Sequence, residues 1–217
     1  GPAARSLEVA LFLGLLLVYS YFIQPSGANA LSRYDLVLAI AEHNTTVIDA
    51  YHINTGDKGY FNGHYYSDKP PGVALLSLPF YLGLRALLAP LHLWPLNDQY
   101  VIYLLNLFVA AAPTALLGVL ILRVLRRLGV ANGPSFAAAV VYGLGTLALP
   151  FATLYFGHQT AAFFGFAAFY ALFVGRERRH QGRWAFLAGL AVGLAVLAEY
   201  PLAIVAVLLG LYLLARL

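Results

Sequence analysis

Long apolar runs alternate with short basic or Gly/Pro-rich breaks along most of this chain. A bilayer core admits only backbone that satisfies its own hydrogen bonds, so each apolar run predicts a helix in the membrane. The runs cover residues 7–23, 100–122, 136–153, 158–174, 184–198 and 202–214. The pattern therefore predicts an all-α, polytopic membrane protein, a helical bundle with about six transmembrane helices.

Composition supports this class. Of 217 residues, 61% are hydrophobic and only 10% are charged, and the mean hydropathy is +0.77, which excludes a water-soluble globule of this size. The sequence has no Cys, so neither disulfides nor thiolate metal sites are available. We interpret the basic pI, about 9.3, as a sign of cytoplasmic arginines and expect no nucleic-acid partner.

The positions of the basic residues predict an orientation. Short loops rich in Arg stay in the cytoplasm. Nine of the 13 basic residues lie at Arg5, in the segments 123–127 and 176–183, and at Arg216. We therefore expect a multi-pass protein of the cell membrane with a cytoplasmic N-terminus and an extracytoplasmic loop over residues 24–98.

One further apolar segment, Val73 to Leu91, is hydrophobic enough to span the membrane. Inserting it would move the arginine clusters to the outer face, and it also contains Arg85 and two prolines. We predict an interfacial or re-entrant helix at the outer boundary.

The loop from Gln24 to Pro71 is longer than a helix connection needs, and such loops are often functional. Residues 32–43 have helical spacing, which predicts a short helix on the membrane surface with Arg33 and Asp35 away from its apolar face. Asp35 would lie in its first turn, where the helix dipole favours a carboxylate. A hydrated polar loop without a function is the alternative. The other acidic and histidine side chains of this loop are Glu42, His43, Asp49, His52, Asp57, His64 and Asp68.

Three short motifs carry a resemblance to a known family. They are Arg33-Tyr34 on the surface helix, the run Gly-His-Tyr-Tyr-Ser-Asp-Lys-Pro-Pro-Gly at 63–72, and the segment 193–201 that ends in Glu-Tyr-Pro. The sequence resembles lipid-linked glycosyltransferases of the GT-C fold, in the superfamily of protein O-mannosyltransferases and lipid A aminoarabinose transferases. Such relatives have more spans, so the chain is expected to be a single transmembrane module, the N-terminal part of a longer protein.

The resemblance implies transfer of a sugar from a polyprenyl phosphate carrier to an acceptor hydroxyl at the outer face, with inversion. This reaction needs a carboxylate for the acceptor's proton and cations for the departing phosphate. Asp35 is the first choice for the base and Asp49 the second, while Lys69 would bind the phosphate. Side chains expected to help bind the substrate are Arg33, Tyr34, Tyr66 and Arg85.

The family also implies a divalent metal ion near the acidic residue before the lysine, which corresponds here to Asp68. His64 and His158 are possible further ligands by their chemistry, because oxygen and imidazole suit such an ion. A histidine that only bonds backbone at its helix start is the alternative for His158. The expected partners are the polyprenyl phosphate sugar, membrane lipid, and an acceptor glycan, lipid or protein.

Two positions depart from the family pattern. Ala30 and Leu31 stand where relatives commonly have an Asp-Glu pair, which leaves the identity of the base open. Glu199 stands where many relatives have a Lys near the carrier phosphate. Its charge is opposite, so it would contact sugar or metal instead, or be a wetted helix end without a function.

Two other classes of function remain open. A transporter or flippase predicts charged or broken helices in repeated halves, and the sequence has no internal repeat. A non-catalytic scaffold or subunit would use the outer loop to bind a partner protein. The scaffold predicts tolerance of charge-neutralising changes at Asp35 and Lys69, whereas the enzyme predicts loss of turnover.

Overall fold

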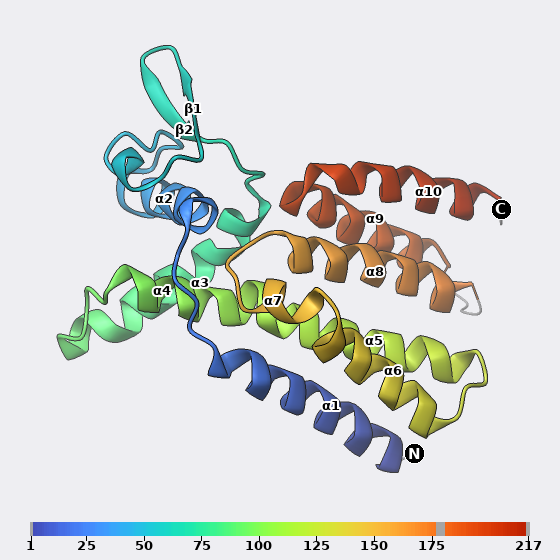
Figure 1. Cartoon of the computed structure of the whole chain (residues 1–217). Coiled ribbons are helices and arrows are strands. Elements are labelled where there is room, and N and C mark those ends of the chain that lie inside the picture. The colour runs from blue at the N-terminus through green and yellow to red at the C-terminus, as the bar shows by residue number, and fades with distance from the viewer. Residues whose placement is uncertain (1, 177–180, 216–217) are drawn as a thin grey trace.

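The computed structural model describes residues 2–176 and 181–215, so Arg178, Arg179 and Arg216 of the basic clusters lie outside the described residues. The described chain is mostly helical (Figure 1). Its helices are α1 (Pro2–Tyr21), α2 (Ala28–His43), α3 (Gly72–Leu88), α4 (Asp98–Asn106), α5 (Ala112–Arg127), α6 (Asn132–Gly145), α7 (Ala148–Ala152), α8 (His158–Gly175), α9 (Gln181–Ala198) and α10 (Ala203–Leu214). Short helical turns are η1 (His52–Asn54), η2 (Ala89–Leu91), η3 (Leu107–Ala111) and η4 (Tyr200–Leu202), and the two strands are β1 (Lys58–Phe61) and β2 (His64–Ser67).

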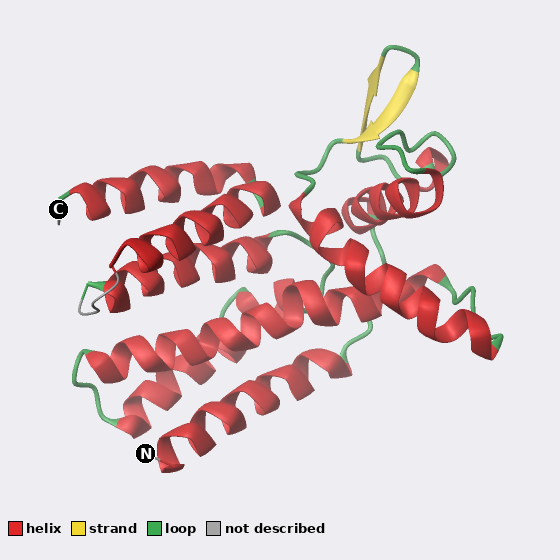
Figure 2. Ribbon diagram, turned by 180° about the vertical axis from the view of Figure 1, so that it is seen from behind, coloured by secondary structure: helices red, strands yellow, loops and turns green. Residues whose placement is uncertain are grey.

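Helices α1, α5, α6, α8, α9 and α10 run roughly alongside one another as a bundle (Figures 1 and 2). Small residues permit close approach of the helices, as lipid-embedded bundles require. Leu15 of α1 packs with Ala115 of α5 and Ala139 of α6, and Tyr19 donates a hydrogen bond to the carbonyl of Gly143 over 3.0 Å.

The two ends of the bundle differ in chemistry. At one end α1 begins, α5 and α8 end, and α6 and α9 begin (Figure 1). Six basic residues belong to these helix ends: Arg5, Arg123, Arg126, Arg127, Arg176 and Arg183. The opposite end carries α2, the β-hairpin and the start of α3. The described arginines of these clusters thus lie at one end of the bundle, as the predicted orientation requires. That this end faces the cytoplasm stays a prediction.

Within the described residues, three helical segments are long and apolar enough to cross a membrane: Gly72–Leu91, Asp98–Arg127 and Gln181–Ala198. Tyr200–Leu214 is a shorter apolar helix. The first of these segments contains α3, which runs obliquely to the bundle (Figures 1 and 2). Its interfacial placement stays a prediction, as does a total of six spans.

The prediction of one continuous helix over residues 136–153 is wrong. Helix α6 ends at Gly145, Thr146 is extended, and the separate helix α7 follows. The Thr146 hydroxyl donates to the carbonyl of Tyr142 over 2.6 Å and accepts from the backbone nitrogen of Ala148 over 3.1 Å. Such local bonds compete with the helical ladder, and the glycines before Thr146 lower helix propensity further.

The loop at the other end is not purely helical or irregular, as the all-α prediction implied. Strands β1 and β2 pair antiparallel, with Gly59 opposite Tyr66. Asn62 and Gly63 both have positive φ, the conformation that a two-residue hairpin turn requires. The strand pattern is short and aromatic, and the Asn-Gly pair was its clearest signal in the sequence.

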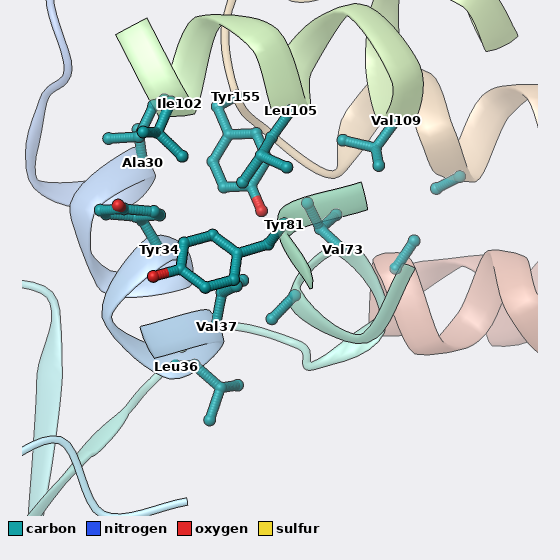
Figure 3. Packing of buried hydrophobic residues seen from close by; sticks show 14 residues of the cluster. Ala30, Tyr34, Leu36, Val37, Val73, Tyr81, Ile102, Leu105, Val109 and Tyr155 are labelled. Atoms are coloured by element: carbon teal, nitrogen blue, oxygen red, sulfur yellow. The ribbon is translucent and has the colours of Figure 1, made fainter. Parts of the chain in front are cut away.

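Helix α2 is buried rather than resting on a surface. Tyr34 and Val37 face Val73 and Tyr81 of α3, and Leu105 of α4 closes this core (Figure 3). Arg33 and Asp35, which were predicted only to lie away from the apolar face, are buried as well. The periodicity identified the helix, but it could not show that the hairpin segment covers its polar side.

Candidate functional site

The candidate site lies where α2 meets the hairpin and the start of α3. The hydroxyl oxygens of Ser32 on α2 and Ser67 on β2 are 2.8 Å apart and share a hydrogen bond. The Ser67 hydroxyl also accepts from the backbone nitrogen of Lys69 over 3.3 Å. Asp35 lies one helical turn beyond Ser32 and therefore on the same side of α2. These contacts join the part of α2 that contains Asp35, the predicted base, to the segment that contains Lys69, the predicted phosphate ligand.

Asp35 is fully buried. Its Oδ1 accepts a hydrogen bond from the side-chain amide of Asn54 over 3.0 Å, and its Oδ2 is buried without a partner. Burial is the main cause that raises the pKa of Asp35 to about 6; Asp98 contributes to this shift, whereas the Asn54 hydrogen bond and Lys58 oppose it. The first-turn prediction is wrong because α2 begins at Ala28, so Asp35 lies beyond the reach of the helix dipole.

Arg33 connects α2 to the far end of α9. It is 2% exposed, and its Nη2 donates to Glu199 Oε1 over 2.9 Å. Its Nε donates to Asn29 over 3.0 Å and its Nη1 to the carbonyl of Pro70 over 3.3 Å. Burial lowers the pKa of Arg33, and the Glu199 carboxylate opposes that shift. The three acceptors fix the guanidinium between three separate segments.

Two glycines make this meeting of segments possible. A Cβ on Gly72 would collide with the backbone of Leu197 and Ala198 in α9. A Cβ on Gly157 would collide with Glu199 and with the carbonyl of Ala198. The starts of α3 and α8 therefore approach the end of α9 as closely as backbone allows.

His158 is the second partner of Glu199. Its Nδ1 lies 3.4 Å from Glu199 Oε1, the same oxygen that accepts from Arg33. The imidazole is about half exposed and packs edge-on against Phe151 and Phe156. Glu199 thus lies between a buried cation and a solvent-facing histidine.

Lys69 is held by two carboxylates. Its ammonium lies 2.9 Å from Asp57 and 3.2 Å from Asp68, and 19% of the side chain is exposed. Burial lowers the pKa of Lys69, but the bonds and charges of Asp57 and Asp68 outweigh it and leave the pKa raised. Lys69 is therefore a protonated, partly open cation at neutral pH.

Asp49 lies outside this group. It is exposed, and it accepts from the backbone nitrogen of Tyr65 and from His64 Nδ1, both over 2.7 Å. The Tyr65 bond, and then the His64 bond, lower the pKa of Asp49. These contacts fix the hairpin to the preceding loop, and Tyr66 contributes to the same hairpin through its pairing with Gly59.

Arg85 is not brought near Lys69. It lies in the last turn of α3, thirteen residues or about 20 Å along the helix from Gly72. Its Nη1 donates to Glu42 over 2.6 Å, and Tyr81 donates to the other oxygen of Glu42 over 2.8 Å. The remaining predicted residue, Tyr34, donates to Asp98 over 3.0 Å in the core between α2 and α4.

The residues predicted to hold a metal ion do not form one ligand set in the described part of the chain. His64 pairs with Asp49, Asp68 with Lys69, and His158 with Glu199. His64 and Asp68 are separated by about 13 Å of strand. The donor types suit a divalent ion, but their arrangement does not fit a shared site, and we assign no step to a metal.

Three contributors to this site were given no role from the sequence: Asn54, Asp57 and Asn29. Each bonds a residue that was singled out, namely Asp35, Lys69 and Arg33. Asn29 and Arg33 are four residues apart on a helix, which is the spacing of a side-chain pair. Asn54 and Asp57 come from an irregular turn, whose path no periodic pattern predicts.

Comparison with known proteins leaves the family open. No family model matches the chain, and no curated protein or solved structure matches it either.

Proposed function

We propose that this chain is a GT-C-like membrane glycosyltransferase, or a module of one, with about six transmembrane helices. It would transfer a sugar from a polyprenyl phosphate carrier to an acceptor hydroxyl at the extracytoplasmic face, with inversion. The observation that carries the proposal is Asp35, a buried carboxylate with one oxygen that has no hydrogen-bond partner among the described residues, on a helix that contacts the segment carrying Lys69. The sequence resemblance supplies the reaction class.

Asp35 has the properties of a general base in this proposal. A base works best when its pKa lies near the working pH, and burial brings the pKa of Asp35 to about 6. It is then ionised at neutral pH and can take the proton of the acceptor hydroxyl through Oδ2. Lys69 would stabilise the negative charge that develops on the departing phosphate.

Access to Asp35 requires a movement. The side chain is 0% exposed, and Asn54 of η1 bonds its other oxygen. An acceptor can reach Oδ2 only when part of the covering layer moves away. Arg33 and Glu199 would act as positioning residues, because they hold α2 against α9 while that layer moves.

The test uses a polyprenyl phosphate with the purified full chain. Native mass spectrometry would compare carrier binding by the wild type, Lys69→Ala, Asp35→Asn and Lys58→Ala. Lys58 is the matched control, as the other of the chain's two lysines and a residue of the same loop. We expect Lys69→Ala to weaken binding about tenfold or more, as for a charged group facing phosphate. Asp35→Asn and Lys58→Ala should bind the carrier as the wild type does.

Turnover then separates binding from catalysis. With a polyprenyl phosphate sugar as donor, Asp35→Asn should lower the rate of sugar release by a factor of about 100 or more while binding is retained. Equal rates for the wild type and Asp35→Asn would overturn the assignment of the base. Failure of the wild type to bind the carrier would overturn the enzyme proposal.

A scaffold is the second candidate, and one feature favours it. The charged residues of the region pair with one another, as Arg33 does with Glu199 and Lys69 with Asp57 and Asp68. Paired charges of this kind also build a rigid binding platform without chemistry. A scaffold predicts that Lys69→Ala leaves carrier binding unchanged.

A further inference from the structure

A second charged region lies at the opposite end of the bundle from the candidate site. An open hollow of about 370 Å³ is lined by Glu8 of α1, by Arg123, Arg126 and Arg127 of α5, and by Tyr170 of α8. Among the described residues, the lining thus contains three guanidinium groups and one carboxylate. Two of the guanidinium groups, those of Arg123 and Arg126, share that carboxylate, and this makes the hollow suited to an anion.

Glu8 does not balance the arginines. Its two oxygens lie 2.6 Å from Arg123 and 3.5 Å from Arg126, so a single carboxylate is shared between two cations. The side chains of Glu8 and Arg126 are 16% and 23% exposed, whereas that of Arg123 is 45% exposed. A phosphate oxygen arriving from outside would find guanidinium donors already oriented, and such pairs are among the stronger hydrogen bonds.

The surroundings of the hollow point to a lipid rather than to a soluble anion. The arginines occupy the last turn of α5, which belongs to a segment long and apolar enough to span a membrane. Leu116 and Leu120 share a face of α5 with Arg123 and Arg127, and Leu116 is 41% exposed. An apolar stripe that ends in a basic hollow matches the shape of a phospholipid, with acyl chains above and a headgroup at the end.

We propose that this hollow binds the headgroup of an anionic phospholipid from the leaflet at the basic end of the bundle. The phosphate would lie between Arg123 and Arg126, and one acyl chain would lie along Leu116 and Leu120. The proposal requires that α5 spans a membrane, but it is independent of glycosyl transfer. It would fix the depth of α1, α5 and α8 relative to the membrane surface.

The test is lipid binding to the full chain purified in detergent. Native mass spectrometry would titrate phosphatidylglycerol and phosphatidylcholine against the wild type, Arg126→Gln and Arg183→Gln. Arg126→Gln leaves the closer Glu8–Arg123 pair intact. Arg183→Gln is the matched control, because Arg183 is an exposed arginine at the same end of the bundle and outside the lining.

We expect the wild type to prefer phosphatidylglycerol over phosphatidylcholine. Arg126→Gln should weaken phosphatidylglycerol binding about fivefold, the usual effect of one arginine at an anionic surface, and Arg183→Gln should leave it unchanged. Glu8→Gln provides a second measurement that does not depend on removing an arginine: it should strengthen phosphatidylglycerol binding severalfold.

Three results would overturn the proposal. They are equal binding of the two lipids, equal losses in Arg126→Gln and Arg183→Gln, and weaker binding in a folded Glu8→Gln variant. Competition with inorganic phosphate distinguishes a lipid headgroup site from a site for free phosphate. If it displaces phosphatidylglycerol at millimolar concentration, the hollow is a free-phosphate site and the lipid assignment fails.

Discussion

Arg33 and Glu199 form an ion pair across 166 residues of sequence, with Nη2 and Oε1 separated by 2.9 Å. The pair joins two of the three motifs that carry the sequence resemblance, one on α2 and one at the end of α9. Glu199 is therefore explained by its local contact, because it neutralises the buried guanidinium of Arg33. The pair also holds the loop region of residues 24–98 against the bundle.

Loss of Glu199 should destabilise the protein strongly. Glu199→Ala leaves the 2%-exposed guanidinium of Arg33 without its counter-ion, which typically costs about 3 kcal/mol. The double variant Arg33→Met, Glu199→Leu should be more stable than Glu199→Leu, because no unpaired charge remains. Thermal unfolding in detergent measures both effects. Strictly additive losses in the double variant would show that the two side chains are not coupled.

Arg85→Ala is the control for this prediction, because it breaks an arginine–glutamate pair and leaves the hydrogen bond from Tyr81 to Glu42 in place. Glu42 also pairs with an arginine, Arg85, over 2.6 Å, but 44% of the Arg85 side chain is exposed. Exposed pairs contribute little, so the loss should be below about 1 kcal/mol. A loss as large as that of Glu199→Ala would mean that burial does not determine the cost.

Gly72→Ala should disrupt the contact between α3 and α9. The added Cβ would lie 2.6 Å from the backbone nitrogen of Ala198 and closer still to Leu197, and backbone atoms cannot rotate away. Overpacking of this kind costs about 1–3 kcal/mol. Thermal unfolding of the purified variant measures the loss, and the Arg33–Glu199 pair should weaken with it because both lie at this junction.

Gly83→Ala is the matched substitution in the same helix. No atom lies within 4 Å of a Cβ at Gly83, so the change adds helix propensity without a collision. It should stabilise the protein by up to about 1 kcal/mol. Equal losses at Gly72 and Gly83 would mean that the close approach to α9 plays no part.

The sequence predicts the bundle well where its apolar runs are uninterrupted. The runs 158–174 and 184–198 correspond closely to α8 and α9, because their boundaries are marked by charged residues or a proline. The run 136–153 is equally apolar, yet Thr146 ends its helix through side-chain bonds to the backbone. Mean hydropathy does not detect such a break, since one threonine scarcely changes it.

For the candidate site, the sequence identified residues by their chemistry, but it did not predict their surroundings in the fold. Arg33, Asp35 and Lys69 lie on segments that contact one another. Their burial and partners could not be predicted, because Asn54 and Asp57 reach them from irregular backbone and Glu199 from the other end of the chain. Local periodicity carries no information about contacts of that separation.

The two candidate bases should respond to pH in opposite directions. Burial raises the pKa of Asp35 from 3.8 to about 6, so between these values the folded state binds more protons than the unfolded state. The stability from Asp35 is complete below about pH 4 and is lost as pH rises through about 6. The Asp35→Asn variant has no carboxylate here and does not lose this stability. The difference between its unfolding free energy and that of the wild type should therefore increase by up to about 3 kcal/mol from pH 4 to pH 7.

Asp49→Asn supplies the opposite sign in the same experiment. The bonds from Tyr65 and His64 lower the pKa of Asp49, so its contribution is present above its ordinary pKa and is lost as pH falls. Asp49→Asn should therefore destabilise the protein at neutral pH and have less effect in acid. Thermal unfolding of both variants and wild type across this pH range measures the two slopes. Slopes of the same sign would contradict the assignment of Asp35 as the buried carboxylate with the raised pKa, and with it the reason for choosing Asp35 over Asp49 as the base.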